Sequence, residues 1–206
     1  MFYFVKTPWW LKQLYANRVW NMPAKDKTIY LTFDDGPHPA ATTFALDVLK
    51  QYHAQATFFC IGKNVAEHPE IYHRILAEGH RTGNHTHNHL NGKKTDDKRY
   101  FENILEAEKY IDSDLFRPPY GRITRFQATH LMQKLKYRII MWDVLSADFD
   151  VEITVEKCLQ HVIKNASDGS IVIFHDSEKA MERMSYALPK VLTCFTEKGF
   201  VFKAIG

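Results

Sequence analysis

The chain has 206 residues, 45% of them hydrophobic and 25% charged, and its formal net charge at pH 7 is +3. This length suits one sizeable hydrophobic core but not two comfortable domains, and the composition is globular. The small net charge, without a basic run or an aromatic RNA-type motif, gives no positive case for a nucleic-acid partner.

The first 25 residues differ from the rest because they concentrate large apolar side chains in a short segment. We expect residues 1–25 to pack on the rest of the chain as a lid or plug. The alternative is an interfacial helix in peripheral contact with an anionic membrane, because all charges within residues 1–21 are positive. The apolar residues are Trp9, Trp10, Leu14, Tyr15, Val19 and Trp20, and the cations are Lys6, Lys12 and Arg18.

Neither an export signal nor a membrane-spanning segment is visible in the sequence. The apolar run at the N-terminus is too short for a secretory signal and has no basic region before it. No later stretch reaches the ~20 apolar residues that a spanning helix needs. We therefore expect a cytoplasmic protein, with membrane association only through residues 1–21. The three cysteines have spacings that fit neither a disulfide framework nor a zinc knuckle.

From residue 28 onward, strand-like apolar runs alternate with amphipathic helical ones. This alternation predicts a parallel α/β sheet with right-handed crossovers. About seven units indicate a distorted (β/α) barrel of about seven parallel strands, TIM-barrel-like, formed by one domain over residues 26–206. The expected strands are 28–33, 56–61, 80–83, 115–117, 137–142, 170–175 and 200–204. The expected helices are 40–52, 67–78, 95–112, 125–136, 153–165 and 181–198.

Two adjacent carboxylates, Asp34 and Asp35, end the first of these strands, and Gly36 and Pro37 follow them. Neighbouring side chains of a strand face opposite ways, so both acids can share a site only where the strand stops. Two carboxylates held close together repel unless a cation or a base relieves them. The pair therefore predicts a metal nearby or one acid kept for proton transfer. The alternative is a solvated turn.

Three histidines in five residues, His85, His87 and His89, follow a later strand. Two imidazole nitrogens and one carboxylate oxygen, with a fourth position left to water, are the ligands typical of a catalytic zinc. His85 and His89 are four apart, so a single turn places both on one side. Spacing alone also allows His87 to replace either of them. The alternative is a polar loop with solvated histidines.

Polar or titratable residues follow five separate predicted strands. In a (β/α) barrel, the C-terminal ends of the strands form the rim where catalytic residues converge. This distribution indicates an active site more strongly than any single motif does. The residues are Asp34 with Asp35, then His85, Arg117, Trp142 with Asp143, and His175.

With these residues assembled, the chain resembles the polysaccharide deacetylase family, the NodB-homology domain of carbohydrate esterases, from about residue 28 to the C-terminus. Three motifs carry the resemblance: Thr-Phe-Asp-Asp-Gly at 32–36, His-Thr-His-Asn-His at 85–89 and Arg-Pro-Pro-Tyr-Gly at 117–121. Two further motifs are altered. At 145–149 the chain reads Leu-Ser-Ala-Asp-Phe, where the family commonly has Asp-x-x-Asp-Trp. At 173–175 it reads Ile-Phe-His, where the family has Leu-x-His.

The resemblance implies a divalent metal, zinc or another transition metal, bound by Asp35, His85 and His89. It also implies that Asp34 is the general base that takes a proton from a metal-activated water. Arg117 would keep Asp34 ionised and oriented.

The remaining implied roles are stabilisation of the oxyanion together with the metal and, on the other side of the scissile bond, protonation of the leaving amine. The backbone N–H of Tyr120 would stabilise the oxyanion. His175 would protonate the leaving amine, and Asp148 would keep that imidazole charged. The alternative for His175 is a core histidine paired with Asp176 beside it.

The implied function is a metal-dependent hydrolase that removes N-acetyl groups from an N-acetylglucosamine-type poly- or oligosaccharide, an acetylated carbohydrate substrate. An O-acetyl glycan esterase would use the same residues. A catalytically silent carbohydrate-binding relative is a further alternative, supported by the altered stretch at 145–149. The intact Asp34 argues against it, because a binding protein has no use for a separate base.

Overall fold

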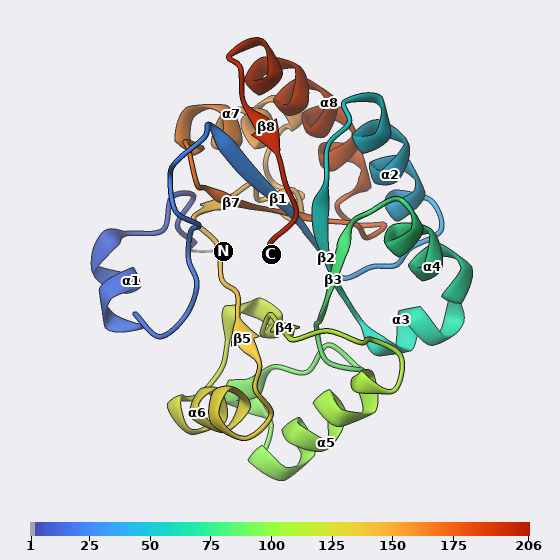
Figure 1. Cartoon of the computed structure of the whole chain (residues 1–206), viewed down its shortest axis with the longest axis vertical. Coiled ribbons are helices and arrows are strands. Elements are labelled where there is room, and N and C mark those ends of the chain that lie inside the picture. Colours follow the sequence, from blue (N-terminus) through green and yellow to red (C-terminus); the bar gives the residue numbers. More distant parts are fainter. Residues whose placement is uncertain (1–2) are drawn as a thin grey trace.

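The computed structural model describes residues 3–206, in which all strands belong to one parallel sheet that curls into a barrel, with helices on its outer side (Figure 1). The strand order is β5-β4-β3-β2-β1-β7-β6, and β8 pairs with the start of β1. The predicted α/β fold of about seven parallel strands is therefore confirmed. Its elements follow in chain order.

The strands are β1 (Thr28–Asp34), β2 (Ala56–Cys60), β3 (Arg81–Asn84), β4 (Leu115–Phe116), β5 (Arg138–Ile139), β6 (Val144–Leu145), β7 (Ile171–His175) and β8 (Val201–Phe202). The helices are α1 (Trp9–Leu14), α2 (Ala41–Gln51), α3 (Gly62–Glu67), α4 (Pro69–Ala77), α5 (Asp97–Glu108), α6 (Arg125–Gln133), α7 (Val155–Asn165) and α8 (Met181–Glu197). Two short 3₁₀ turns, η1 (Gly92–Lys94) and η2 (Pro119–Gly121), complete the described structure.

Strand β1 lies inside the sheet between β2 and β7 and is almost completely buried. Both faces of a parallel strand are covered, which explains its apolar and β-branched sequence. On the helix-facing side, the Phe33 ring stacks on Phe58 of β2 at 4.8 Å and on Phe174 of β7 at 6.1 Å. On the barrel side, Thr32 donates its hydroxyl proton to the Val172 carbonyl oxygen. The strand that carries both acids thus has no freedom to shift.

Side-chain caps fix the starts of three crossover helices. Asp96, Thr124 and Thr154 each accept a hydrogen bond from the backbone N–H three residues later. Thr124 and Gln127 form a reciprocal capping box, which satisfies two backbone donors at the start of α6.

The C-terminal residues close the end of the barrel where the strands begin. Ile205 is fully buried in a cluster with Phe59 and Ile140, and its backbone N–H donates to the Thr57 hydroxyl at 2.9 Å. Arg138 donates to the carbonyl oxygen of Gly206 at 2.6 Å. The interior is therefore filled at this end, so a site inside the barrel would open at the opposite rim.

The predicted strand over 137–142 is wrong in its extent. The structure has β5 at Arg138–Ile139 and a separate strand, β6, that the sequence did not predict. Between them, residues 140–143 carry the chain from one edge of the curled sheet to the other. A segment that crosses between edges cannot continue in the ladder, so its backbone pairs with the N-terminal residues instead. Helix α3 was also not predicted.

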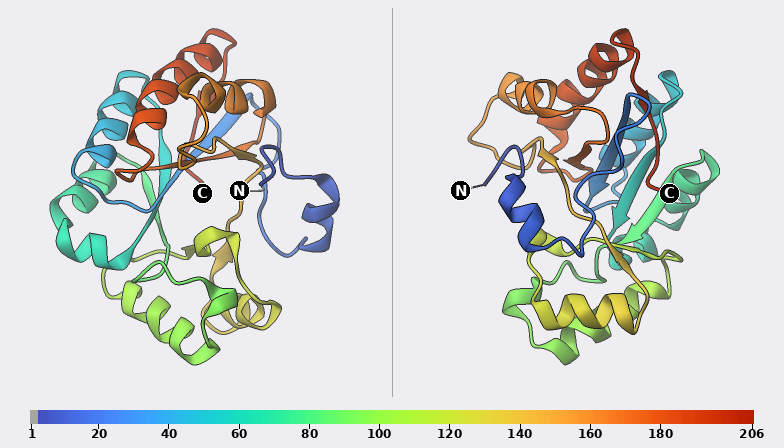
Figure 2. Two further views of the ribbon diagram at one scale, coloured as in Figure 1. Left: turned by 180° about the vertical axis from the view of Figure 1, so that it is seen from behind. Right: turned by 60° about the vertical axis from the view of Figure 1, so that its left-hand side comes forward.

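Residues 3–22 run beside this crossing (Figure 2). Val19 pairs with Ile140 in parallel, and Lys6 pairs with Val144 antiparallel, so the segment contacts both sheet edges. Paired edges cannot recruit other strands. Helix α1 itself contributes no buried residue. The division of the chain at residue 25 stays a prediction.

Asp143 anchors this segment. Its buried carboxylate accepts hydrogen bonds at 2.6 Å from Lys6, from Lys12 and from the Ser170 hydroxyl. Arg18, the remaining cation of residues 3–21, is buried and lies over the Tyr15 ring at 4.3 Å. The cations on which the interfacial-helix alternative depends are therefore engaged with the protein. No helix in the described residues is long and apolar enough to span a membrane.

Replacing Asp143 by Asn should destabilise the fold, because two lysines lose their charged acceptor. We expect the free energy of unfolding to fall by about 1–3 kcal/mol in urea titrations at neutral pH. Burial raises the pKa of Asp143, but the hydrogen bonds from Lys12, Lys6 and Ser170 outweigh it and hold the pKa below its ordinary value. The stabilisation is therefore present at neutral pH and lost as the pH falls below the usual carboxyl range.

The matched control is Glu67→Gln, which breaks the exposed 3.7 Å pair with Lys63. It should change the free energy of unfolding by less than about 0.5 kcal/mol. If both variants lost the same free energy of unfolding, Asp143 would not anchor the N-terminal segment.

Candidate active site

The end of β1 places two carboxylates on one side. Asp34 is the last residue of the strand, and Asp35 follows with a left-handed φ of 84°. This break in the strand conformation reverses the usual alternation of side chains. Both acids then face His85, whose Nε2 lies 3.8 Å from Asp34 Oδ2 and 3.7 Å from Asp35 Oδ1. The expected shared site is present.

Asp35, His85 and His89 form a group whose ligand atoms lie within 4.8 Å of one another. His89 Nε2 lies 3.2 Å from Asp35 Oδ1, a buried oxygen for which the described residues supply no hydrogen-bond partner. His85 Nδ1 donates to the Arg117 carbonyl at 2.7 Å, so Nε2 carries the lone pair and faces the two acids. An unsatisfied carboxylate oxygen and two imidazoles fit a divalent transition metal.

Electrostatics keep this group ready to bind a cation. Burial lowers the pKa of His85 to about 4, so its imidazole is neutral at pH 7. Burial raises the pKa of Asp35, but the 3.2 Å contact with His89 and the other nearby imidazoles outweigh it and hold the pKa below its usual range. His87 is not part of the group. Its ring stacks on Tyr110 at 5.7 Å, and its Nδ1 lies against Gly62.

The guanidinium of Arg117 is fully buried inside the barrel and is aimed at Asp34. Its Nη1 donates to Asp34 Oδ1 and to the Thr32 hydroxyl, each at 2.7 Å. Nε and Nη2 donate to the carbonyl oxygens of Ile140 and Met141. Asp34, only 3% exposed, is therefore oriented by a cation that is itself fixed by four acceptors.

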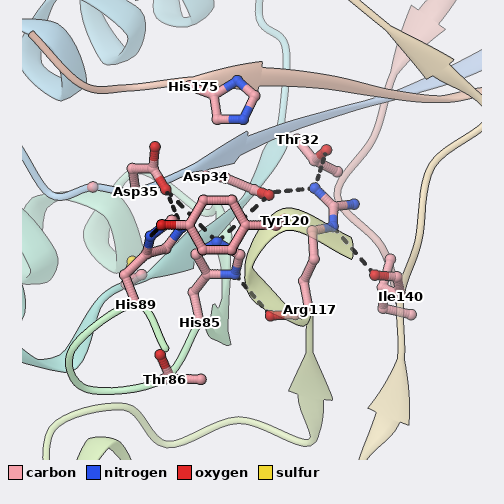
Figure 3. A network of polar contacts seen from close by, with 12 residues as sticks. Thr32, Asp34, Asp35, His85, Thr86, His89, Arg117, Tyr120, Ile140 and His175 are labelled. Atoms are coloured by element: carbon pink, nitrogen blue, oxygen red, sulfur yellow. Dashed lines mark hydrogen bonds and ion pairs between the residues drawn. The ribbon is translucent and has the colours of Figure 1, made fainter. Parts of the chain in front are cut away.

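His175 and Asp148 form a second pair, in which Asp148 is fully buried and His175 is partly exposed. His175 donates its Nδ1 proton to Asp148 Oδ1 and its backbone N–H to Oδ2, both at 2.7 Å. Burial lowers the pKa of His175, but the charge and hydrogen bond of Asp148 outweigh it and raise the pKa to about 9. In the register of β1 and β7, His175 lies directly beside Asp34. Figure 3 shows both acids between His175 and the pair His85 and His89.

Asp176 is not the partner of His175. Its carboxyl group accepts from the Gly36 backbone N–H at 3.0 Å and from the Thr42 hydroxyl. Burial raises its pKa well above the usual range. Asp176 thus holds the turn after Asp35. The position of Asp176 next to His175 in the sequence suggested a pair, but the partner of His175 in the structure is Asp148.

Asp148 sits in a strained turn that the sequence did not predict. Ala147 before it has a φ of 62°, a conformation that costs energy for any residue with a Cβ. Arg183 of α8, which is 5% exposed, donates from Nε to the Asp148 carbonyl at 2.7 Å. Sequence reasoning missed Arg183, because a single arginine in an amphipathic helix carries no signal of burial.

Tyr120 and Phe149 border the site on opposite flanks. Tyr120 has a left-handed φ of 60°, is 58% exposed, and its hydroxyl lies 3.1 Å from His89 Nδ1. The Phe149 ring meets the His175 ring edge-on at 5.1 Å. Leu145, the last residue of β6, is buried in a cluster with Ile173. The altered stretch at 145–149 thus still supplies Asp148 and an aromatic ring.

The barrel and its rim place the chain among α/β-barrel proteins with a candidate metal centre at the C-terminal ends of the strands. A family model described as polysaccharide deacetylase matches residues 21–140. The chain belongs to the polysaccharide deacetylase family.

Individual relatives agree with this membership. A peptidoglycan-N-acetylglucosamine deacetylase of Bacillus cereus is 36% identical over 193 residues, which cover 91% of this chain and 90% of the relative. A chitooligosaccharide deacetylase of Azorhizobium caulinodans is 33% identical over 156 residues, which cover 72% of this chain and 73% of the relative. The crystal structure of the Bc1960 peptidoglycan N-acetylglucosamine deacetylase superposes with a TM-score of 0.88 at 30% identity, covering 97% and 95% of the two chains.

The group formed by Asp35, His85 and His89 predicts that His87 and His89 differ in their effect on zinc binding. His89→Ala should weaken zinc binding, measured by calorimetry on chelator-treated protein, by more than the roughly 10–100-fold that loss of an outer hydrogen bond costs. His87→Ala should keep wild-type affinity, because His87 faces Tyr110. Both variants should keep the wild-type circular dichroism spectrum. If His87→Ala lost zinc as His89→Ala does, the ligand assignment would be wrong.

Proposed function

We propose that this protein hydrolyses the acetamido group of an N-acetylglucosamine-type poly- or oligosaccharide. One observation carries the proposal: Asp34, fixed by Arg117, lies between the metal-ligand group and the charged pair of His175 and Asp148. A base and an acid on either side of a metal site are what amide hydrolysis requires, since water must lose a proton and the amine must gain one.

Asp35, His85 and His89 would hold a zinc ion or another divalent transition metal. A bound zinc supplies a water of lowered pKa and polarises the acetyl carbonyl. Asp34 takes the proton of the attacking water. Its Oδ1 is occupied by Arg117, so Oδ2, which faces His85, is the oxygen available for that proton.

His175 serves the opposite side of the bond, whereas Tyr120 lies against His89 on the side of the metal-ligand group. With a pKa of about 9, His175 is protonated on both nitrogens at neutral pH, and Nδ1 is committed to Asp148. Nε2–H is therefore the proton that reaches the leaving nitrogen. The backbone N–H of Tyr120, presented by its left-handed turn at the rim, stabilises the oxyanion of the substrate.

The charged state of His175 favours an amide substrate over an O-acetyl ester. An amine leaves poorly unless its nitrogen is protonated, whereas an alcohol is a better leaving group and depends less on the acid. The named activities of the Bacillus cereus and Azorhizobium caulinodans relatives, on N-acetylglucosamine-containing glycans, support the same choice. An intact base supports catalysis over binding alone.

Acetate release from an N-acetylglucosamine tetramer, compared with release from acetylated xylan, tests this proposal. The zinc-loaded protein should prefer the tetramer. Asp34→Asn should bind zinc as the wild type does but lose about 10²–10⁴ in kcat, because the base is gone and the ligands remain. Preference for acetylated xylan would indicate an O-acetyl esterase. Unchanged turnover in Asp34→Asn would show that Asp34 is not the general base.

The pKa of His175 predicts the alkaline limb of the pH–rate profile. Activity should fall as the pH rises through about 9, where His175 loses its proton. Asp148→Asn should move this limb to lower pH, because the anion that outweighs the burial of the imidazole is removed. Glu152→Gln, an exposed acid four residues away, is the matched control and should leave the limb in place. If the alkaline limb stayed in place in Asp148→Asn, Asp148 would not be the residue that keeps His175 protonated.

A further inference from the structure

The N-terminal residues pair with the stretch that carries Asp148 and Phe149. The Val5 carbonyl accepts from the Leu145 backbone N–H at 2.8 Å, and the Thr7 backbone N–H donates to the Asp143 carbonyl at 2.8 Å. Strand β6 is only two residues long and lies at the edge of the sheet. Its outer side is therefore paired by residues 5–7, and the Asp143 anchor secures them.

A row of three rings continues from this pairing into the site. The Tyr3 ring packs edge-on against Phe149 at 5.8 Å, and Phe149 packs edge-on against His175 at 5.1 Å. The Tyr3 hydroxyl donates to Asp150 Oδ2 at 2.8 Å, which fixes the Tyr3 ring against Phe149. Phe149 is half-buried, so part of its ring remains accessible.

The chemistry of the acid places the sugar next to the Phe149 ring. The nitrogen that His175 protonates stays bonded to the sugar, so the sugar lies within reach of His175. Phe149 touches His175 and must therefore border the sugar. Aromatic side chains line sites of this kind because their apolar faces cover the C–H groups of a ligand.

We propose that Tyr3 is a specificity-determining positioning residue, which holds the Phe149 ring as a wall for the sugar beside His175. This inference rests on the proposed function of the site. A ring that is already held by a neighbouring side chain loses little rotamer freedom when the sugar binds, whereas an unsupported ring must be ordered at that moment. The N-terminal segment is then a part of the substrate site.

Steady-state kinetics on the N-acetylglucosamine tetramer tests the proposal. Tyr3→Ala should raise KM about two- to tenfold, the range that one aromatic pair is worth. Its kcat should stay within about twofold of wild type, because the wall contacts substrate and transition state alike. Tyr3→Phe keeps the ring but loses the hydrogen bond to Asp150, so its KM should lie between those of Tyr3→Ala and the wild type. If Tyr3→Ala does not fold, Tyr3→Leu replaces it, since it keeps the apolar bulk without a flat ring.

Two comparisons make the result specific. Trp9→Ala removes a larger ring from the same segment, but Trp9 is 76% exposed, so KM should not change. In a Phe149→Ala background, Tyr3→Ala should have no further effect, because a positioning residue acts only through its target. An equal rise in KM in both backgrounds, or no rise in wild type, would overturn the proposal.

This double-mutant cycle of Tyr3 and Phe149 also distinguishes the role of Tyr3 from the proposed function. If the tetramer is turned over and Tyr3→Ala leaves KM unchanged, the proposed function stands and this inference fails. If only acetylated xylan is turned over, the proposed function fails. The same cycle on xylan then decides the role of Tyr3, because Phe149 borders the sugar of either substrate.

Discussion

A buried guanidinium inside the barrel is the constraint on which the rim depends. Arg117 loses its hydration on folding, a cost that only a complete set of acceptors can offset. Those acceptors come from β1 and from the crossing at Ile140 and Met141, and the Phe59 ring lies beneath it at 4.1 Å. The carbonyl of the same residue orients His85. Arg117 therefore aligns both Asp34, the proposed base, and His85, a proposed metal ligand.

The sequence predicted the parts of the site that follow directly from strand ends. Asp34 and Asp35 were expected to converge with His85 and His89, because parallel strands present their C-terminal ends at one rim, and they do. It did not predict β6 or the turn at Asp148. A two-residue strand has no periodicity to recognise, and the turn is held by Arg183 from α8, a contact that only the tertiary fold creates.

The two acids of the pair have different surroundings although they are adjacent in the chain. Asp34 is bound to an arginine and nearly inaccessible, while Asp35 has a free oxygen directed at imidazoles. The left-handed Asp35 and the turn held by Asp176 create this difference. A motif can show that two carboxylates are present, but their different surroundings depend on Arg117, 83 residues from Asp34, and on Asp176, 140 residues from Gly36.

The two ends of the described chain are each tied to distant partners. Lys6 binds Asp143, 137 residues later, and Ile205 binds Thr57, 148 residues earlier. Contacts between residues so far apart in sequence require large loops to close before they stabilise anything. Its interior is sealed only once Ile205 has reached Thr57 and Lys6 has reached Asp143, so we expect the barrel to fold slowly.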